Sequence, residues 1–503
     1  MDSIYGQDKE VKELRLVDKM ANKVRESLRG FLRITPASQN EITIMEKMNY
    51  AGSAAINRVW YRGDADELSQ AYKCIDGEST RSMFWTAVPS AGMHIRKIHT
   101  GIPGLMIDVL TSIVMTDYNG IEVTGDAGEW DKIEEDNNFA DTVAEAITEA
   151  LIVGDGAFKI TYDPDISKYP ILEFVPGDRV QYTIKHKRVI EVIFNTTYHR
   201  DYNSYNLIET YGYGYIDSEL YKGNKKIELN SIPETNGLES RIEHDNSFIM
   251  AIPFKINKSH KWQGRGASIF DRKEGDFDAL DEAWSQWMEA VRLGRAKEYI
   301  PDSMLPHNPK TGEVIRPNPF DNAYIARESP MMQGVRDKID VVQPSIPHDA
   351  YAATYITALD LALQGIISPS TLGIDVKKLD NAEAQREKEK ATLYTRNKII
   401  EALQNTLPEV VKTLIITNSA LKNNSIPKDI TVSVNFGEYA NPSFESQIET
   451  VSKGKQNGIL SIEASVEELY GDSKDDEWKA AEVKRLKAEQ GIAEIDELQI
   501  DDL

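Results

Sequence analysis

DRKEGDFDALDEAWSQWMEAVRLGR is the stretch from Asp271 to Arg295, and its pattern decides the architecture expected around it. Its apolar residues are spaced three and four positions apart, which places them on one side of a helix: Phe277, Leu280, Trp284, Trp287 and Val291. This 3, 4, 3, 4 spacing is typical of a seam between packed helices. The stretch therefore predicts a long helix that buries one stripe against a partner helix.

The other side of this predicted helix is acidic, with carboxylates at Asp276, Asp278, Asp281, Glu282 and Glu289. Carboxylates this close on one helix are ordinarily a solvated face. The alternative is a nuclease-like cluster that binds a divalent metal. The two tryptophans of the seam offer a similar choice between helix packing and base stacking, and packing is the ordinary interpretation.

After this helix, the sequence predicts a proline-rich stretch followed by two further long helices. Residues 301–347 predict short strands at 313–315, 324–326 and 338–342. A helix over 349–366 has Tyr351 and Tyr355 on one face, and a loop over 368–381 leads to a third long helix over 382–406. Pro408 is expected to kink or break that helix. A strand over 430–436 and an acidic helical region over 437–503 follow.

The residues before the long helix predict a mixture of helix and sheet. Residues 1–50 and the segments around 102–115 and 139–153 have helical periodicity, and 60–63 lies in a loop-rich stretch. Gly154-Asp155-Gly156 is interpreted as a helix stop. Period-two alternation then predicts strands at 157–162, 171–175, 189–198, 207–215 and 219–221, with a hairpin turn at Asp217-Ser218. The expected fold class is α+β.

Composition argues against a protein that grips DNA. The formal net charge is −23, whereas proteins that bind phosphates tightly are usually basic. An acidic wall could still enclose a duplex and let it slide. A hydrophobic fraction of 41% allows a sizeable core, and no apolar run of about 18 residues predicts a membrane helix. The single cysteine, Cys74, is expected to be a small buried side chain.

No catalytic motif is evident in the sequence. It has no G-x-x-x-x-G-K-[ST] phosphate loop, no H-E-x-x-H and no G-x-S-x-G. His94 and His99 are five residues apart and make poor metal ligands. We therefore expect no catalytic residues, no metal and no cofactor.

Basic residues cluster in two predicted loops. Lys310, Arg316, Arg327, Arg336 and Lys338 punctuate the proline-rich stretch, and Lys377-Lys378 lies in the loop between the second and third long helices. Each cluster is either a solvated loop or a binding surface, and the residues alone leave this open.

The order of these segments resembles the portal proteins of tailed bacteriophages, over roughly residues 90–490. The stretches that carry the resemblance are Val153–Lys159 at a helix-to-strand junction, Phe174–Arg179, Gly264–Phe270 leading into the long helix, Ser368–Gly373 after the returning helix, and Asn457–Ser461 before a short helix. Each stretch alone is weakly specific, and their order and spacing make the resemblance.

The resemblance implies a portal fold with a wing, stem, clip and crown, in which long helices surround a central channel in a ring, commonly of twelve subunits. The implied regions are the wing at 1–265, the stem helix at 266–296, the clip at 297–348, the returning stem helix at 349–367, the tunnel loop at 368–381, a long kinked wing helix and strand at 382–436, and the crown and tail at 437–503.

The resemblance also implies roles. The five carboxylates listed above would line the tunnel, and the seam residues with Tyr351 and Tyr355 would pack the stem. Lys377 and Lys378 would contact passing double-stranded DNA. The basic clip residues Lys310, Arg316, Arg327 and Arg336 would bind first the terminase large subunit and then the head-tail connector.

Further implied partners are other copies of the chain and the major capsid and scaffolding proteins, with no membrane. The implied location is the portal vertex of the virion, after synthesis in the host bacterial cytoplasm. Two alternatives are a metal-dependent DNA-processing hydrolase that uses the acidic cluster and another head-tail connector or collar protein.

Overall fold

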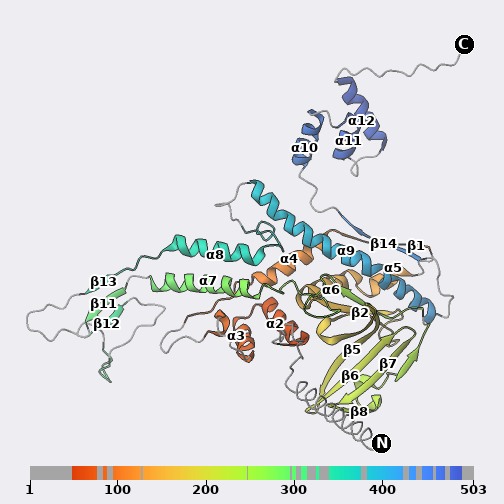
Figure 1. Ribbon diagram of the computed structural model, residues 1–503, viewed down its shortest axis with the longest axis horizontal. Helices are drawn as coiled ribbons and strands as arrows, with labels where there is room; N and C mark the ends of the chain where they lie inside the picture. The colour runs from red at the N-terminus through yellow and green to blue at the C-terminus, as the bar shows by residue number, and fades with distance from the viewer. Residues whose placement is uncertain are drawn as a thin grey trace, which may run out of the picture. The chain divides into compact units, whose positions relative to one another are not determined.

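The computed structural model describes residues 48–75, 83–87, 95–125, 129–245, 247–294, 297–301, 307–313, 324–327, 339–374, 382–422, 430–437, 444–456, 460–470 and 476–489. The chain divides into two compact units. Unit 1 is built from the described parts of Met1–Ser112 and Val123–Val432, and unit 2 from those of Ile113–Glu122 and Ser433–Leu503. Figure 1 shows the elements of both units. Their mixture of helix and sheet confirms the α+β class.

The helices described before Gly154 are α2 (Tyr50–Arg62), α3 (Ala65–Cys74), the short η2 (Phe84–Thr86), α4 (Ile102–Thr116), α5 (Trp130–Asp136) and α6 (Phe139–Val153). The helix predicted in the first 50 residues lies, up to residue 47, outside the described residues. The loop predicted at 60–63 is wrong, because α2 continues to Arg62. Trp60 is fully buried against Tyr72 and Phe277, and this distant packing leaves no local pattern. Cys74 is exposed rather than buried.

The centre of unit 1 is a three-stranded antiparallel sheet covered by α6 (Figure 1). Its strands are β2 (Asp155–Thr161), β3 (Ile171–Pro176) and β10 (Ala251–Lys255), in the order β10-β2-β3. Phe158, Phe174 and Phe254 pack with ring centroids 5.1–6.1 Å apart. The predicted helix stop is confirmed at Gly154, which has a φ of +115°.

A larger sheet extends from this centre. It contains β4 (Val180–Lys185), β5 (Arg188–Arg200), β6 (Asn203–Gly212), β7 (Tyr215–Lys222) and β8 (Lys225–Ile227) in chain order, with β9 (Arg241–Glu243) paired to β7. Short η3 (Gly177–Arg179), η4 (Leu229–Ser231) and η5 (Pro233–Thr235) lie beside these strands in the chain. The turn predicted at Asp217-Ser218 is wrong, because both residues lie inside β7. Gly212 pairs with Tyr215, so the turn is Tyr213-Gly214. Gly214 has a φ of +85°, which favours glycine there.

Two long helices, α7 (Glu274–Leu293) and α8 (His348–Leu363), lie side by side (Figure 1). The segment between them forms a small sheet of β11 (Lys297–Pro301), β12 (Tyr324–Arg327) and β13 (Asp340–Val342), in the order β12-β11-β13. The strands predicted near 324–326 and 338–342 are confirmed. β11 was not predicted, and residues 314–315 of the remaining predicted strand lie outside the described residues.

Helix α9 (Ala382–Leu421) continues through Pro408, so the predicted break is wrong. A proline inside a helix removes one hydrogen bond and costs about 3 kcal/mol. Fully buried apolar residues lie on both sides of it, among them Leu403, Leu407, Val410 and Val411. Their burial, at about 1.5–3 kcal/mol for each large side chain, outweighs the cost of the proline. A kink at Pro408 stays a prediction.

Unit 2 contains three short helices, α10 (Phe444–Gln456), α11 (Ile462–Tyr470) and α12 (Asp476–Glu489). Glu463 and Lys487 join α11 to α12 at 2.6 Å, and the rings of Tyr470 and Trp478 lie 5.0 Å apart. Strand β1 (Tyr118–Gly125) pairs with β14 (Ile430–Phe436), which confirms the strand predicted at 430–436. Within the described residues, no helix is long and apolar enough to cross a bilayer.

Candidate functional site

The contact between α7 and α8 is aromatic. Trp284 lies 5.3 Å and Trp287 lies 6.3 Å from the ring of Tyr355, and the two tryptophan rings are 5.7 Å apart. Burial raises the pKa of Tyr355. Three of the predicted stem-packing residues therefore meet within one subunit, as packing residues rather than as exposed rings for stacking. Their role between subunits stays a prediction.

The remaining residues of the predicted seam differ in burial along α7. Phe277 and Leu280 are fully buried, and Phe277 packs against Trp60 of α2 and Phe270. Tyr351 lines a groove beside Glu289 of α7. At the far end of α7, Val291 is 44% exposed. The seam is thus buried at its beginning and open at its end.

One face of the α7–α8 pair is open and nearly uncharged. A groove of about 410 Å³ is lined by Asp276, Ala279, Ala353, Thr354, Thr357, Ala358 and Leu361. Leu361 is 47% exposed. Helix α8 reads HDAYAATYITALDLAL, so apolar or small residues occur around most of its circumference. A helix with this composition is usually covered on more than one side. We call these seven residues the stem groove.

Asp278 and Asp281 do not lie on a solvated face, and that prediction is wrong. They are 7% and 1% exposed. Asp278 accepts hydrogen bonds from the backbone N–H groups of Phe84 at 2.8 Å and Trp85 at 3.2 Å. Burial raises the pKa of Asp278, and these two hydrogen bonds oppose the rise. In this conformation neither carboxylate can line a tunnel.

Asp281 accepts hydrogen bonds from a second buried segment, which contains His99 and Thr100. Its Oδ1 accepts from the Thr100 N–H and hydroxyl, both at 2.9 Å, and its Oδ2 lies 2.6 Å from His99 Nδ1 and 3.2 Å from Trp85 Nε1. Buried N–H groups require acceptors, and these come from residues about 180 positions later in the chain. The carboxylates therefore bind segments of this chain. Among the described residues, no group of three His, Cys, Asp or Glu side chains could hold a metal ion.

The other three predicted tunnel-lining carboxylates are partly exposed. Asp276 pairs with Lys273 at 3.1 Å, Glu289 pairs with Arg292 at 2.6 Å, and Glu282 accepts from Gln286 at 2.8 Å. Short-range partners of this kind on a helix surface contribute a few tenths of a kcal/mol each. Their place in a tunnel stays a prediction.

The predicted loop sites lie largely outside the described residues, as Lys377, Lys378, Arg316, Arg336 and Lys338 all do. Lys310 is exposed in a turn, and Arg327 ends β12. Lys310 is thus the one residue of this set whose side chain the structure describes, and the DNA-loop and clip assignments stay predictions.

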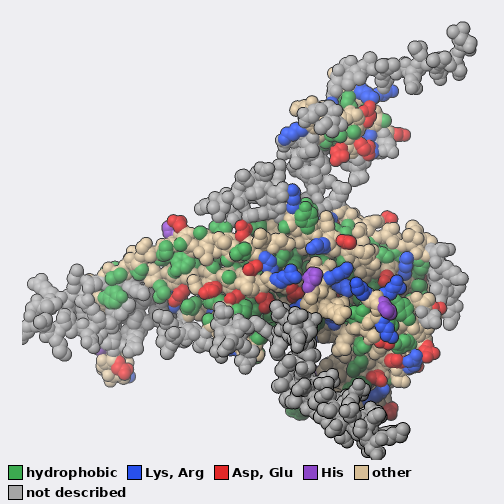
Figure 2. All heavy atoms as spheres, viewed as in Figure 1, with side chains coloured by type: hydrophobic (Ala, Val, Ile, Leu, Met, Phe, Trp, Pro, Cys, Tyr) green, Lys and Arg blue, Asp and Glu red, His purple; other side chains and the backbone are tan. Residues whose placement is uncertain are grey.

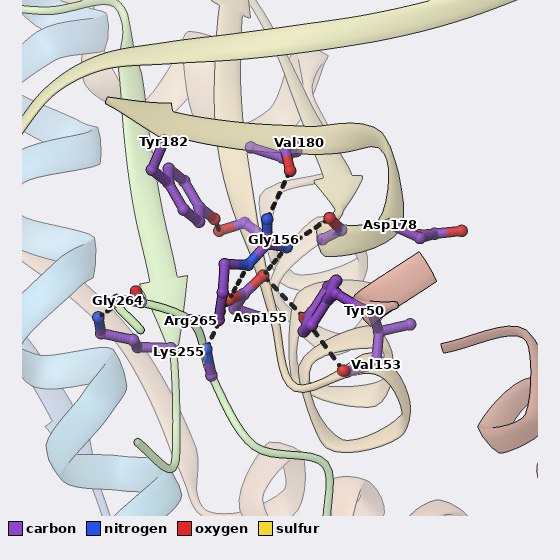
Figure 3. A network of polar contacts seen from close by, with 12 residues as sticks. Tyr50, Val153, Asp155, Gly156, Asp178, Val180, Tyr182, Lys255, Gly264 and Arg265 are labelled. Carbon is purple, nitrogen blue, oxygen red and sulfur yellow. Dashed lines mark hydrogen bonds and ion pairs between the residues drawn. The ribbon is translucent and has the colours of Figure 1, made fainter. Parts of the chain in front are cut away.

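A buried junction that the sequence pattern did not reveal joins Asp155, at the start of β2, to Arg265, in the segment that leads to α7 (Figure 3). The guanidinium of Arg265 donates to both carboxylate oxygens of Asp155, at 2.7 and 2.9 Å. It also donates to the carbonyl oxygens of Val180 at 2.7 Å and Gly177 at 2.5 Å. In Figure 3 the side chain is flanked by the ring of Tyr50, 3.8 Å away, and that of Tyr182, 5.0 Å away.

Asp155 is the centre of this junction and is 1% exposed. Besides Arg265, it accepts from the Gly266 N–H at 2.6 Å and the Tyr50 hydroxyl at 3.0 Å. Burial, the largest cause, raises the pKa of both tyrosines, Tyr50 and Tyr182. The carboxylate is thus fully surrounded by donors, as a buried charge must be.

Glycines allow the backbones to meet at this junction. A Cβ on Gly266 would overlap the Gly154 carbonyl, and one on Gly177 would overlap the Asp155 carboxylate. Just beyond, Ile269 donates its N–H to the Leu151 carbonyl at 2.9 Å. The glycine-containing stretches at 153–159, 174–179 and 264–270 therefore converge at one point. That common pattern of glycine beside a charge was the signal that could have predicted the junction.

Comparisons with known proteins find similar chains among solved structures. No family model and no curated protein matches the chain. A solved structure titled as the virion of a native gene transfer agent particle contains a similar chain, with 12% identity and a TM-score of 0.35, covering 83% of this chain and 98% of that one. A second, the neck of a native gene transfer agent particle computed with C12 symmetry, has 12% identity and a TM-score of 0.32, covering 72% and 89%. Similarity at this level supports no inference about function.

Proposed function

We propose that this chain is a portal subunit, which assembles with other copies into a ring, commonly of twelve, around a channel for double-stranded DNA. The observation that carries the proposal is the α7–α8 pair, whose open stem groove has no cover in the described residues of one subunit. Exposed apolar surface of this kind marks an interface. In a ring, the same pair from each neighbour would cover it.

The α7–α8 pair is anchored at one end and exposed at the other, which supports the same proposal. The base of α7 is fixed to the α+β centre by the Asp155–Arg265 junction, and by the hydrogen bonds from Phe84 and Trp85 to Asp278. The far end of the pair carries a small sheet with exposed Val341 and Val342. In a ring of such subunits, the α7–α8 pairs would surround the channel and be anchored at the end near the α+β centre. The small sheet at their other end would be exposed to partners. We propose these partners to be the terminase large subunit and then a head-tail connector.

The proposed role is structural rather than catalytic. The competing hydrolase would need the carboxylates near Asp276 to bind metal. Two of them, Asp278 and Asp281, instead accept hydrogen bonds from this chain. The net charge of −23 fits a channel wall that repels phosphate. We further propose that the ring occupies the portal vertex of a virion, in contact with capsid and scaffolding proteins.

The test is negative-stain microscopy and mass photometry of the purified full chain over a range of concentrations. We expect rings with a central channel. Leu361→Glu should reduce the ring population, because burying the exposed half of this leucine contributes about 1 kcal/mol per interface and a buried, unpaired carboxylate opposes assembly. Leu238→Glu, at a leucine 37% exposed outside the stem groove, is the control. Compact monomers at every concentration would contradict the proposal.

A further inference from the structure

A basic groove lies on unit 1 apart from the stem groove. It has a volume of about 770 Å³, and its cationic lining residues come from three places in the chain. Lys258 and Lys261 follow β10, Arg272 precedes α7, and Lys398 lies in the middle of α9. All four are exposed in an otherwise acidic chain. We call this set the basic groove.

Asp271 and Glu274 line the basic groove together with the cations, but three of the four cations form no ion pair with a described carboxylate. Within the described residues, Lys258, Arg272 and Lys398 form no ion pair. Arg272 has a φ of +71°, a conformation that costs energy for any residue with a side chain. Asp271 also lines the groove, but it is half-buried. The groove thus keeps positive charge available to a partner.

A second basic element lies near the loop that carries Lys261. Residues 185–188 comprise the end of β4, a two-residue turn and the start of β5; they read Lys185-His186-Lys187-Arg188, and all four are exposed. The preceding residue, Ile184, packs against Gly264, in the loop that also carries Lys261. Figure 2 shows Lys and Arg side chains gathered over the middle of unit 1 on the face in view. We call this turn the basic hairpin.

We propose that the basic groove and the basic hairpin bind an acidic surface on a neighbouring copy of this chain. The inference rests on the proposed ring. A closed ring needs a heterologous interface, in which two different surfaces of the subunit meet. The chain has 81 acidic and 58 basic residues, so a concentrated basic surface faces a largely acidic neighbour. Complementary charge of this kind sets the orientation and register of an interface.

The mixed lining of the groove favours a protein over a nucleic acid. Asp271 and Glu274 line it together with the cations. A phosphate backbone offers only acceptors and negative charge, so these carboxylates would repel it. A protein surface carries donors and cations as well as carboxylates, and can satisfy both kinds of lining residue. The net charge of −23 also repels a duplex beyond the groove.

The experiment compares ring assembly of wild-type chain with that of Lys258→Glu/Arg272→Glu/Lys398→Glu by mass photometry. We expect the triple variant to need at least about tenfold more protein for the same ring fraction, since exposed charge pairs contribute modestly and reversal makes them repulsive. Raising NaCl from about 50 to about 500 mM should weaken wild-type assembly and have less effect on the variant. The milder Lys258→Gln/Arg272→Gln/Lys398→Gln variant should show a smaller loss with an unchanged fold.

The matched control is Lys168→Glu/Lys222→Glu/Lys225→Glu, which makes the same change in net charge at exposed lysines outside both basic elements. It should assemble as the wild type does. Equal assembly of the groove variant and the control would overturn this inference, but it would not contradict the proposed ring. A wild-type chain that never assembles would instead count against the proposed function. Binding of a duplex that is lost in the groove variant, with assembly unchanged, would show that phosphate is the ligand and refute the inference.

Discussion

Arg265→Met tests whether the buried junction holds the base of α7. The substitution keeps an unbranched side chain of similar reach but removes the charge. The Asp155 carboxylate, 1% exposed, would keep only the donors of Gly266 and Tyr50. The carbonyl oxygens of Gly177 and Val180 would lose their donor.

The expected loss in the free energy of unfolding is about 3–5 kcal/mol, the usual cost of removing one partner of a buried pair. The assay is urea unfolding followed by tryptophan fluorescence. Six of the seven tryptophans lie in unit 1, and Trp478→Phe removes the one in unit 2. In that background the signal reports on unit 1, which avoids treating two units as one transition.

The control is Arg58→Met. Arg58 pairs with Glu149 at 2.8 Å and Asp178 at 3.1 Å, but its side chain is 29% exposed. A partly exposed pair of this kind contributes about 1 kcal/mol or less. A double-mutant cycle with Asp155→Asn should give a coupling energy of at least about 1.5 kcal/mol with Arg265. An Arg265→Met cost no larger than that of Arg58→Met would mean that the buried junction stabilises unit 1 no more than a partly exposed ion pair does.

Three further predictions concern the α7–α8 pair and the predicted tunnel loop at 368–381. Asp281→Ala should cost about 2–4 kcal/mol in the same urea assay, because it leaves the buried donors of Thr100 and Trp85 without an acceptor; a cost below about 1 kcal/mol would show that water replaces the carboxylate. Tyr355→Ala should cost about 1–2 kcal/mol and change the near-UV circular dichroism of the tryptophans it contacts, and an unchanged spectrum would contradict the ring contacts. Lys377→Ala/Lys378→Ala should reduce the DNA packaged per particle more than ring assembly, measured by quantifying encapsidated DNA, and wild-type packaging would remove the functional role of the loop.

Side-chain periodicity in the sequence predicted the local elements wherever one period dominated. The seam from Phe277 to Val291 predicted α7, and the same reasoning placed α6, β3 and β14 within a residue or two. These assignments follow from side-chain spacing along one element, which is a local property. The α+β class followed from the change of period after Gly154. The net charge is also known from the sequence without a structure.

Which charged residues are buried depends on how distant parts of the chain pack together. Asp278 and Asp281 have the spacing of a surface face, yet they bind the backbone N–H groups of Trp85 and Thr100, which are 193 and 181 positions away. Arg265 and Asp155 are 110 positions apart, and neither shows locally that the other is its partner. A charge is buried only where distant donors converge, and that convergence is a property of the assembled chain. The same reason explains why Pro408 leaves α9 unbroken: the buried neighbours that stabilise the helix belong to the folded core.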